Sequence, residues 1–307
     1  MPKVSIIIRG KNEEDWLGIT LRAIKEQDFK NYEIIYVDNL SEDSSVEIAK
    51  EEGVEKIVSI KKYLPGLAIN KGIEVSEGEL ICILSAHCVP FNKKWLSNLV
   101  KSIEDNEDLA GVYGRQYPLP FSFPDDARDL LITFGEEDIV QKKDPFFHNA
   151  NSIIRKEILK KIPINSKISN IEDREWAKRV LDKGYQLKYS SDSKVFHFHG
   201  LHQHGKKSSF RAESVSNLIK DISNTNKYTL PNWFNLKNRE CPIIFYGKNQ
   251  NFPKKIKDFI SLNRGITEQM FYFADKKIKS NNDAIFIKRK ISYDAPFSKF
   301  LNEILNN

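Results

Sequence analysis

Short β-branched runs alternate with helix-forming segments over the first hundred residues of the chain. Runs with strand character occupy residues 4–9, 33–38, 54–60 and 80–85. Segments with helical spacing lie between and after them, at 13–26, through Val46 and Ala49, at 67–75 and at 95–103. Because this order is that of right-handed β–α–β units, it predicts an α/β fold with a mostly parallel central sheet flanked by helices.

The alternation continues with less regularity to about residue 205. Strands are predicted at 111–116, 149–155 and 185–190, and a helix at 173–183. The proline-rich stretch at 118–124 predicts an excursion over the open side of the sheet. Beyond residue 205 the spacing is helical, including a stretch through Phe271. We therefore predict one domain over 1–205 and a basic, mainly helical region over 206–307.

Charge is distributed unevenly along the chain. The net charge is +6, but residues 206–307 contain 19 Lys and Arg against 9 Asp and Glu, which gives this region +10 and leaves −4 for the rest. A basic region of this kind meets an anionic lipid surface, a nucleic acid or an acidic acceptor, or it forms an ordinary solvated face.

Several features favour a cytoplasmic protein. No run approaches the roughly 20 apolar residues of a membrane-spanning helix, and the N-terminal residues enter a strand pattern without a cleavable signal. The three cysteines, Cys82, Cys88 and Cys241, form no Cys-x-x-Cys spacing, so they are interpreted as reduced thiols.

Polar residues follow three of the predicted strands at their carboxyl ends, where ligands bind in an open α/β sheet. These are residues 9–13, Asp38 with Asn39, and residues 85–88. No Gly-x-Gly-x-x-Gly follows the first strand and no P-loop occurs in the sequence, so dinucleotide-binding and NTPase functions lack their phosphate cradle.

Four stretches of the chain resemble the family 2 glycosyltransferases. SIIIRGKNEE (5–14), YEIIYVDNLSEDSS (32–45) and the run 65–90 are similar to the nucleotide-binding half of that family. The stretch 170–199 resembles its acceptor half, in which a Glu-Asp pair opens a helix and a histidine closes the following strand. The order and spacing of these motifs are specific, although each motif alone is weak. The resemblance implies the GT-A fold, with a nucleotide half over about 1–115 and an acceptor half over about 116–205.

The resemblance also implies a nucleotide-sugar site. Asp38 is expected to contact the base or ribose, and its alternative role is that of a helix N-cap. Asn70 and Gly72 belong to a loop that shapes the site, and Lys71 is either a diphosphate contact or a solvated lysine. The residues predicted to bind the nucleotide sugar are Arg9, Glu13, Asp38, Asn39, Asn70, Lys71, Ser85, Ala86 and His87.

The largest departure from the family pattern is Ser85-Ala86-His87, which stands where typical members carry an Asp-x-Asp motif that binds a divalent metal. Loss of both carboxylates removes the main ligands for Mg²⁺. Two solutions remain open. One is a softer site made by His87 with His197 or His199, suited to Mn²⁺; the other uses no metal, with imidazole and lysine groups stabilising the leaving diphosphate. No organic cofactor other than the donor is expected.

By the same resemblance, Asp173 of the Glu172-Asp173 pair is the base that takes the proton of the acceptor hydroxyl. The alternative is an acidic first turn that interacts with the helix dipole. The acceptor side is predicted to include Arg115, Gln116, His148 and Asn149, which stand in segments that mix aromatic and polar groups.

The expected function is that of an inverting glycosyltransferase. It moves a sugar from a nucleotide-sugar donor to a saccharide or lipid-linked acceptor, in surface polysaccharide or glycoconjugate synthesis. The basic region 206–307 is expected to lie on the inner face of an anionic membrane or to form an oligomer contact, and no nucleic acid is expected as a partner. The alternatives are a nucleotidyltransferase and a non-catalytic protein that binds nucleotide sugars or polyanions.

Overall fold

The computed structural model describes residues 2–62, 64–119, 130, 133–168 and 171–198, together with two strands at 240–246 and 271–277. The described residues fall into two compact units. The first contains residues 2–115 and 136–195. The second contains residues 116–119, 130, 133–135 and 196–198 and the two later strands.

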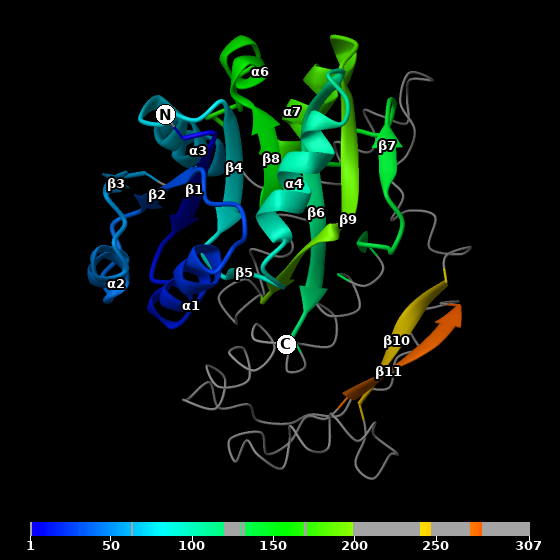
Figure 1. The fold of residues 1–307 in the computed structure, drawn as a ribbon, viewed down its shortest axis with the longest axis horizontal. Coiled ribbons are helices and arrows are strands. Elements are labelled where there is room, and N and C mark those ends of the chain that lie inside the picture. The colour runs from blue at the N-terminus through cyan, green and yellow to red at the C-terminus, as the bar shows by residue number, and fades with distance from the viewer. Residues whose placement is uncertain are drawn as a thin grey trace. The chain divides into compact units, whose positions relative to one another are not determined.

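The chain follows a β–α–β rhythm from its first strand (Figure 1). The strands of the main sheet are β1 (Val4–Gly10), β2 (Tyr32–Asp38), β3 (Lys56–Ser59), β4 (Leu80–Ser85), β5 (Cys88–Pro90), β6 (Leu109–Pro118), β7 (Ile139–Gln141), β8 (Asn151–Arg155) and β9 (Gln186–His197). The helices are α1 (Glu14–Lys25), α2 (Ser45–Glu51), α3 (Pro65–Glu74), α4 (Trp95–Glu104), α6 (Lys156–Lys161) and α7 (Glu172–Asp182).

The order in which the chain adds strands to the sheet reverses at β1. The sheet runs β3-β2-β1-β4-β8-β6-β9-β5, and β7 pairs with β9. The chain moves outward from β1 through β2 to β3 and then returns to pair β4 with the other side of β1, in parallel. This reversal is a topological switch point, and the crevice at the carboxyl ends of such strands is where open α/β sheets bind ligands.

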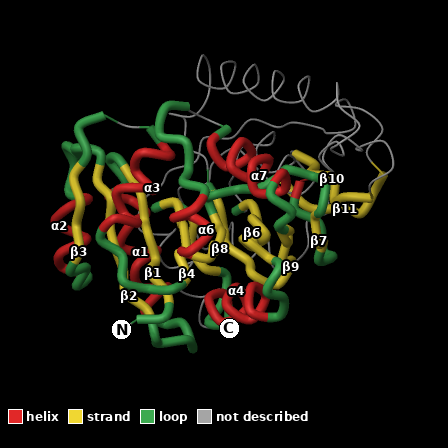
Figure 2. Tube along the Cα trace, turned by 90° about the horizontal axis from the view of Figure 1, so that it is seen from above, coloured by secondary structure: helices red, strands yellow, loops and turns green. Residues whose placement is uncertain are grey.

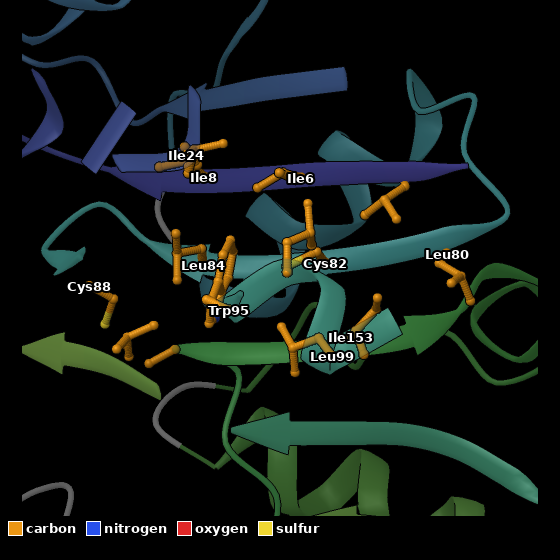
Figure 3. Close-up of a cluster of buried hydrophobic side chains, with 14 of the residues drawn as sticks. Ile6, Ile8, Ile24, Leu80, Cys82, Leu84, Cys88, Trp95, Leu99 and Ile153 are labelled. Carbon is orange, nitrogen blue, oxygen red and sulfur yellow. The ribbon is translucent and has the colours of Figure 1, made fainter. Parts of the chain in front are cut away.

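Helices cover both faces of this sheet, with α1 and α4 on one face and α3 and α7 on the other (Figures 1 and 2). Alternate residues of β1 and β4, including Ile6, Ile8, Cys82 and Leu84, pack against apolar residues of α1 and α4 and are fully buried (Figure 3). Period-two alternation sends the intervening residues to the opposite face.

Glycine allows α3 to lie close to the opposite face of β1. A Cβ atom on Gly72 would lie 2.6 Å from Cγ2 of Ile7, and a Cβ atom on Gly66 would lie 2.2 Å from the carbonyl oxygen of Asn165. Both distances are shorter than van der Waals contact, so a side chain at Gly72 would push α3 away from β1, and one at Gly66 would push it away from the backbone at Asn165.

The sheet is mixed rather than mostly parallel. The pairs among β1, β2, β3 and β4 are parallel as expected, but β8 runs antiparallel to both β4 and β6, and β7 runs antiparallel to β9. The elements β5, β7 and α6 were not predicted, because three to six residues are too few to show a hydrophobic period.

Two corrections concern the later chain. Strand β9 continues past residue 190 to His197. In the region predicted to be helical, the two segments that the structure describes are the antiparallel strands β10 (Glu240–Tyr246) and β11 (Phe271–Lys277). Both contain β-branched or aromatic runs, IIFY and FYF, whose strand preference outweighs the helical spacing. The remainder of 206–307 lies outside the described residues.

Candidate active site

The carboxyl ends of β1, β2 and β4 meet at the switch point. The register of the parallel pairs sets Gly10 opposite Asp38 and Arg9 opposite Ser85. The backbone continues this alignment, since the N–H of Asn39 donates to the carbonyl of Gly10 at 3.1 Å. Four predicted site residues from three separate motifs, Arg9, Asp38, Asn39 and Ser85, therefore lie along one edge of the sheet.

The loops that follow β1 and β2 are joined by hydrogen bonds in both directions. The N–H of Asn12 donates to Oγ of Ser41, and the N–H of Glu42 donates to Oδ1 of Asn12, each at 2.9 Å. The N–H of Glu13 donates to Oγ of Ser45 at 2.8 Å. Asn12 adopts a left-handed φ of 55°, which asparagine tolerates better than most residues. We refer to these contacts as the loop latch.

Asp38 is held inside the turn that follows β2. Asp38 is 2% exposed. Its carboxylate accepts hydrogen bonds from the backbone N–H of Ser41 at 3.1 Å and from the Ser41 hydroxyl at 2.5 Å. The N-cap position of α2 belongs to Ser44. Asp38 therefore organises the loop at the switch point and does not act as the cap of α2.

The Ser85-Ala86-His87 segment is anchored on both sides. The Ala86 N–H donates to the carbonyl of Arg9 at 3.3 Å, and the Ala86 carbonyl accepts from the Thr20 hydroxyl at 2.7 Å. Nδ1 of His87 lies 2.9 Å from Oε1 of Glu13, and only 12% and 10% of the two side chains are exposed. The structure thus pairs two predicted donor-site residues that are 74 positions apart.

Glu172 and Asp173, the acid pair, begin helix α7 and are both buried. One Asp173 oxygen accepts from the backbone N–H of Arg174 at 2.8 Å, and the other accepts from the N–H of Asn149 at 3.3 Å. Glu172 faces Nη1 of Arg9 at 3.5 Å. The Arg9 contact ties the first turn of α7 to the end of β1, so the acid pair belongs to the switch-point edge.

The surroundings of the acid pair favour the protonated carboxyl groups. Burial raises the pKa of Glu172 from its ordinary 4.5 to about 7, the charge of Asp173 adds to this rise, and the Arg9 guanidinium opposes it. Burial also raises the pKa of Asp173, against the charge of Arg174 and the N–H groups that its carboxylate accepts from. A carboxylate with a raised pKa is a stronger proton acceptor than one in water.

Asn70 and Lys71 on α3 have different environments. The Asn70 amide donates to the carbonyl of Ile164 at 2.7 Å, which links α3 to the segment before α7. The Lys71 side chain is half-buried, and its ammonium group forms an ion pair with Glu74 at 2.7 Å, one helical turn away. The assignment of Lys71 to the diphosphate stays a prediction.

Three of the predicted acceptor-side residues lie in the first unit. Nη2 of Arg115 contacts Oε1 of Glu136 at 3.2 Å, although the arginine side chain is buried and the glutamate is exposed. Nδ1 of His148 accepts from the N–H of Ala150 at 3.3 Å. Asn149 is fully buried and supports Asp173 through its backbone. The Asn149 hydrogen bond brings this residue to the acid pair, and the acceptor roles of all three residues stay predictions.

Gln116 and His197 belong to the second unit and contact each other, with Oε1 of Gln116 2.5 Å from Nδ1 of His197. His197 is the last residue of β9, as the resemblance implies, and His199 lies outside the described residues. Within the part of the chain that the structure describes, no group of three or more His, Cys, Asp and Glu is placed to hold a metal ion. The metal site at His87, His197 and His199 stays a prediction.

Two residues that contact the predicted site were missed by sequence reasoning. Arg174 follows the acid pair, and its guanidinium lies over the ring of Phe146 at 5.0 Å, in cation–π geometry. Ser41 holds Asp38 and accepts from Asn12. An arginine directly after two buried acids was a usable signal for the first, whereas nothing in the sequence pairs the second with a residue 29 positions away.

The family model for glycosyl transferase family 2 matches residues 5–163. Among curated proteins, the chain is similar to glycosyltransferase AglE of Haloferax volcanii, with 27% identity over 206 residues that cover 62% of this chain and 66% of that protein. It is also similar to the GalNAc(5)-diNAcBac-PP-undecaprenol beta-1,3-glucosyltransferase of Campylobacter jejuni, with 24% identity over 61% of this chain and 62% of that protein. The matched segment is less than two thirds of the length of either relative.

Solved structures share the fold. The mannosyltransferase PcManGT from Pyrobaculum calidifontis, solved with GDP-Man and Mn²⁺, aligns with a TM-score of 0.57 and 17% identity over 74% of this chain and 66% of that chain. Residues 1–349 of S. aureus TarS, solved with UDP-GlcNAc, align with a TM-score of 0.56 and 18% identity over 73% of this chain and 67% of that chain. The sheet and its helices therefore form the GT-A fold.

The raised pKa of Glu172 predicts a specific pH dependence of stability. Below about pH 4.5 the carboxyl is protonated in the folded and unfolded chains, whereas between 4.5 and about 7 only the unfolded chain loses the proton. The free energy of unfolding should therefore fall through this window, by roughly 3 kcal/mol for this residue. Glu172→Gln should remove that fall, as measured by urea unfolding across the window.

The control is Glu175→Gln, which changes a more exposed acid of the same helix that pairs with Arg179. This variant should keep the pH dependence of the unmodified protein. A Glu172→Gln protein that lost stability with rising pH as steeply as the parent would contradict the assignment.

Proposed function

Since the chain belongs to glycosyl transferase family 2, we propose that it transfers a sugar from a nucleotide-sugar donor to a saccharide or lipid-linked acceptor with inversion. Relatives support the acceptor class, because the name of the Campylobacter protein includes an undecaprenol-linked saccharide. The complex of TarS with UDP-GlcNAc supports the donor class. The proposed setting is the synthesis of surface polysaccharides or glycoconjugates.

The observation that carries the proposal is the buried acid pair beside the switch point. Two acids at the first turn of α7 are linked through Arg9 to the edge where Asp38, Ser85 and His87 also lie. A nucleotide sugar bound at this edge would have a proton acceptor close to its sugar. The carboxylate of Asp173 is buried and oriented by two N–H groups, which is an arrangement that suits a general base.

In the proposed reaction Asp173 acts as the general base. As the acceptor oxygen forms its bond to the anomeric carbon, the carboxylate takes the hydroxyl proton, and the bond from that carbon to the diphosphate breaks on the opposite face. The Asn149 and Arg174 N–H groups orient the carboxylate for this step. Glu172 contacts Arg9 and is influenced by the charge of Asp173. Its proposed role is to support the base rather than to replace it.

The residues at the diphosphate position fit a hard divalent metal poorly. Ser85 offers a neutral hydroxyl, and Nδ1 of His87 is hydrogen-bonded to Glu13. One imidazole and one carboxylate that hydrogen-bond to each other replace the two carboxylates that Mg²⁺ prefers. We propose that the leaving diphosphate is met mainly by His87 and by nearby cationic side chains rather than by a metal ion.

Asp173→Asn should abolish transfer while leaving the donor bound. Loss of a general base lowers kcat by about 10²–10⁴-fold, whereas the amide keeps the shape of the side chain. A thermal-shift screen of UDP-, dTDP-, GDP- and CMP-sugars identifies the donor first, because a ligand of the native state raises Tm. Release of the nucleotide diphosphate from that donor then reports activity.

The matched control is Asp182→Asn, the same substitution at the other end of α7, where the carboxylate pairs with Lys178 near the surface. It should retain near-normal turnover. Unimpaired transfer by Asp173→Asn would rule out the proposed base, and a donor that binds but is never turned over by the unmodified protein would favour a binding module.

Residues 85–87 lack the two carboxylates of the Asp-x-Asp motif, which predicts that activity depends only weakly on a divalent metal. Treatment with excess EDTA should lower turnover by less than about threefold, and added Mn²⁺ or Mg²⁺ should restore no more than that. The restored variant Ser85→Asp/His87→Asp provides the comparison, since it recreates the hard ligand set and should become sensitive to EDTA. Complete and metal-reversible inactivation of the unmodified protein by EDTA would refute the metal-independent mechanism.

We also propose that the basic region 206–307 brings the enzyme to an anionic membrane surface, where a lipid-linked acceptor resides. No helix within the described ranges has the length and apolarity to cross a bilayer. Each Lys or Arg near an anionic surface contributes about 1 kcal/mol, and the net charge of +10 on this region favours such a surface. The full chain should float with acidic liposomes at low salt and dissociate at high salt. Equal recovery with neutral and acidic liposomes would exclude this role and would leave a homo-oligomer contact or an ordinary solvated face.

A further inference from the structure

Arg9 joins parts of the site that are remote in sequence. Its backbone carbonyl accepts the N–H of Ala86, and it stands opposite Ser85 in the parallel pair of β1 and β4. Its guanidinium reaches Glu172, 163 positions later, at 3.5 Å. Only 11% of the Arg9 side chain and 5% of the Glu172 side chain are exposed, so the ion pair is largely shielded from water.

Charge around the acid pair explains why a buried cation is needed at this point. Two adjacent carboxyl groups in a buried place repel each other when both are ionised, and each loses hydration. The charged groups that face Glu172 are Asp173 and Arg174 on its own helix and Arg9 on β1. Arg174 stands in the helix beside the acids and lies over Phe146, so Arg9 is the cation that reaches them from the sheet.

We propose that Arg9 is a positioning residue for the general base: its contact with Glu172 holds the first turn of α7 against the end of β1 and allows Asp173 to work as a carboxylate at neutral pH. The inference rests on the proposed function for its catalytic part. It assigns Arg9 to the acid pair rather than to the nucleotide sugar, which the sequence predicts it to bind. A guanidinium suits this position because it does not lose its proton and presents several donors in a fixed plane.

The catalytic test compares Arg9→Met, which keeps the length of the side chain without its charge, with Arg9→Lys. Loss of the cation raises the pKa of the acids, and because the base works ionised, the acid limb of the kcat profile should move to higher pH by about one unit in Arg9→Met. Turnover at neutral pH should fall about tenfold or more, while the affinity for the free nucleoside diphosphate of the identified donor changes by less than about threefold. Arg9→Lys should return the limb close to its original position.

Arg155→Met is the matched control. Arg155 also stands at a strand end and is partly buried, but its guanidinium donates to the backbone carbonyls of Ile103, Asn106 and Leu109. This variant should lose stability without moving the acid limb. A kcat profile that shifts equally in both variants would show a general structural effect and overturn the proposal.

A second measurement does not depend on catalysis. In Arg9→Met, stability should fall more steeply with pH between about 5 and 8 than in the unmodified protein, since the acids then ionise without their partner. The double variant Arg9→Met/Glu172→Gln should be more stable at neutral pH than Arg9→Met alone, because removing one member of a buried pair leaves an uncompensated charge. If Arg9→Met fails to fold, recovery of folding in the double variant supports the same conclusion.

The outcomes separate the two levels of the hypothesis. If the stability measurements hold but no donor is turned over, the Arg9–Glu172 coupling stands and the proposed function fails. If nucleotide affinity drops more than about tenfold in Arg9→Met while the acid limb stays in place, Arg9 is a donor ligand and the positioning role is wrong. If Arg9→Met shows the same pH dependence of stability and the same acid limb of the kcat profile as the unmodified protein, the Arg9–Glu172 coupling is refuted.

Discussion

The parallel pairing of β1 with both β2 and β4 is the constraint on which the rest of the site depends. Because all three strands end at the same edge, side chains that follow them are brought together without any loop needing to fold back. The same register fixes Arg9 beside Ser85 and Gly10 beside Asp38. A shift of one residue in either pairing register would move the side chains of the shifted strand to the other face of the sheet. The buried core and the site are therefore specified by one set of hydrogen bonds.

The acid pair imposes an electrostatic cost that the fold offsets locally. The helix dipole of α7, the N–H groups of Asn149 and Arg174, and two guanidinium groups all favour ionised carboxylates, while burial disfavours them. The balance leaves Glu172 titrating close to neutral pH. At residues 85–87 a serine hydroxyl and an imidazole replace the two aspartates of the family motif, so this segment carries less negative charge than that motif.

Much of this architecture was predictable from residue patterns. The strands β1, β2 and β4 and the helices α1, α4 and α7 follow from period and length, and the strand-end residues follow from topology. Prediction failed for short elements such as β5 and for the antiparallel entry of β8, because strand direction depends on where the chain has travelled rather than on the local residues. The sequence also did not predict that His87 pairs with Glu13 or that Arg9 pairs with Glu172. Each residue was singled out, but partners 74 and 163 positions apart are set by tertiary packing.

The loop latch has a consequence for how this site varies among descendants of the same gene. Asn12 donates to Ser41 and accepts from Glu42 across the two loops, so a change in one loop alters the shape of the other. Substitutions there are therefore expected to be epistatic: a replacement at Asn12 is tolerated when a compensating replacement occurs near Ser41, and is harmful alone. The two loops would therefore change together in evolution rather than independently.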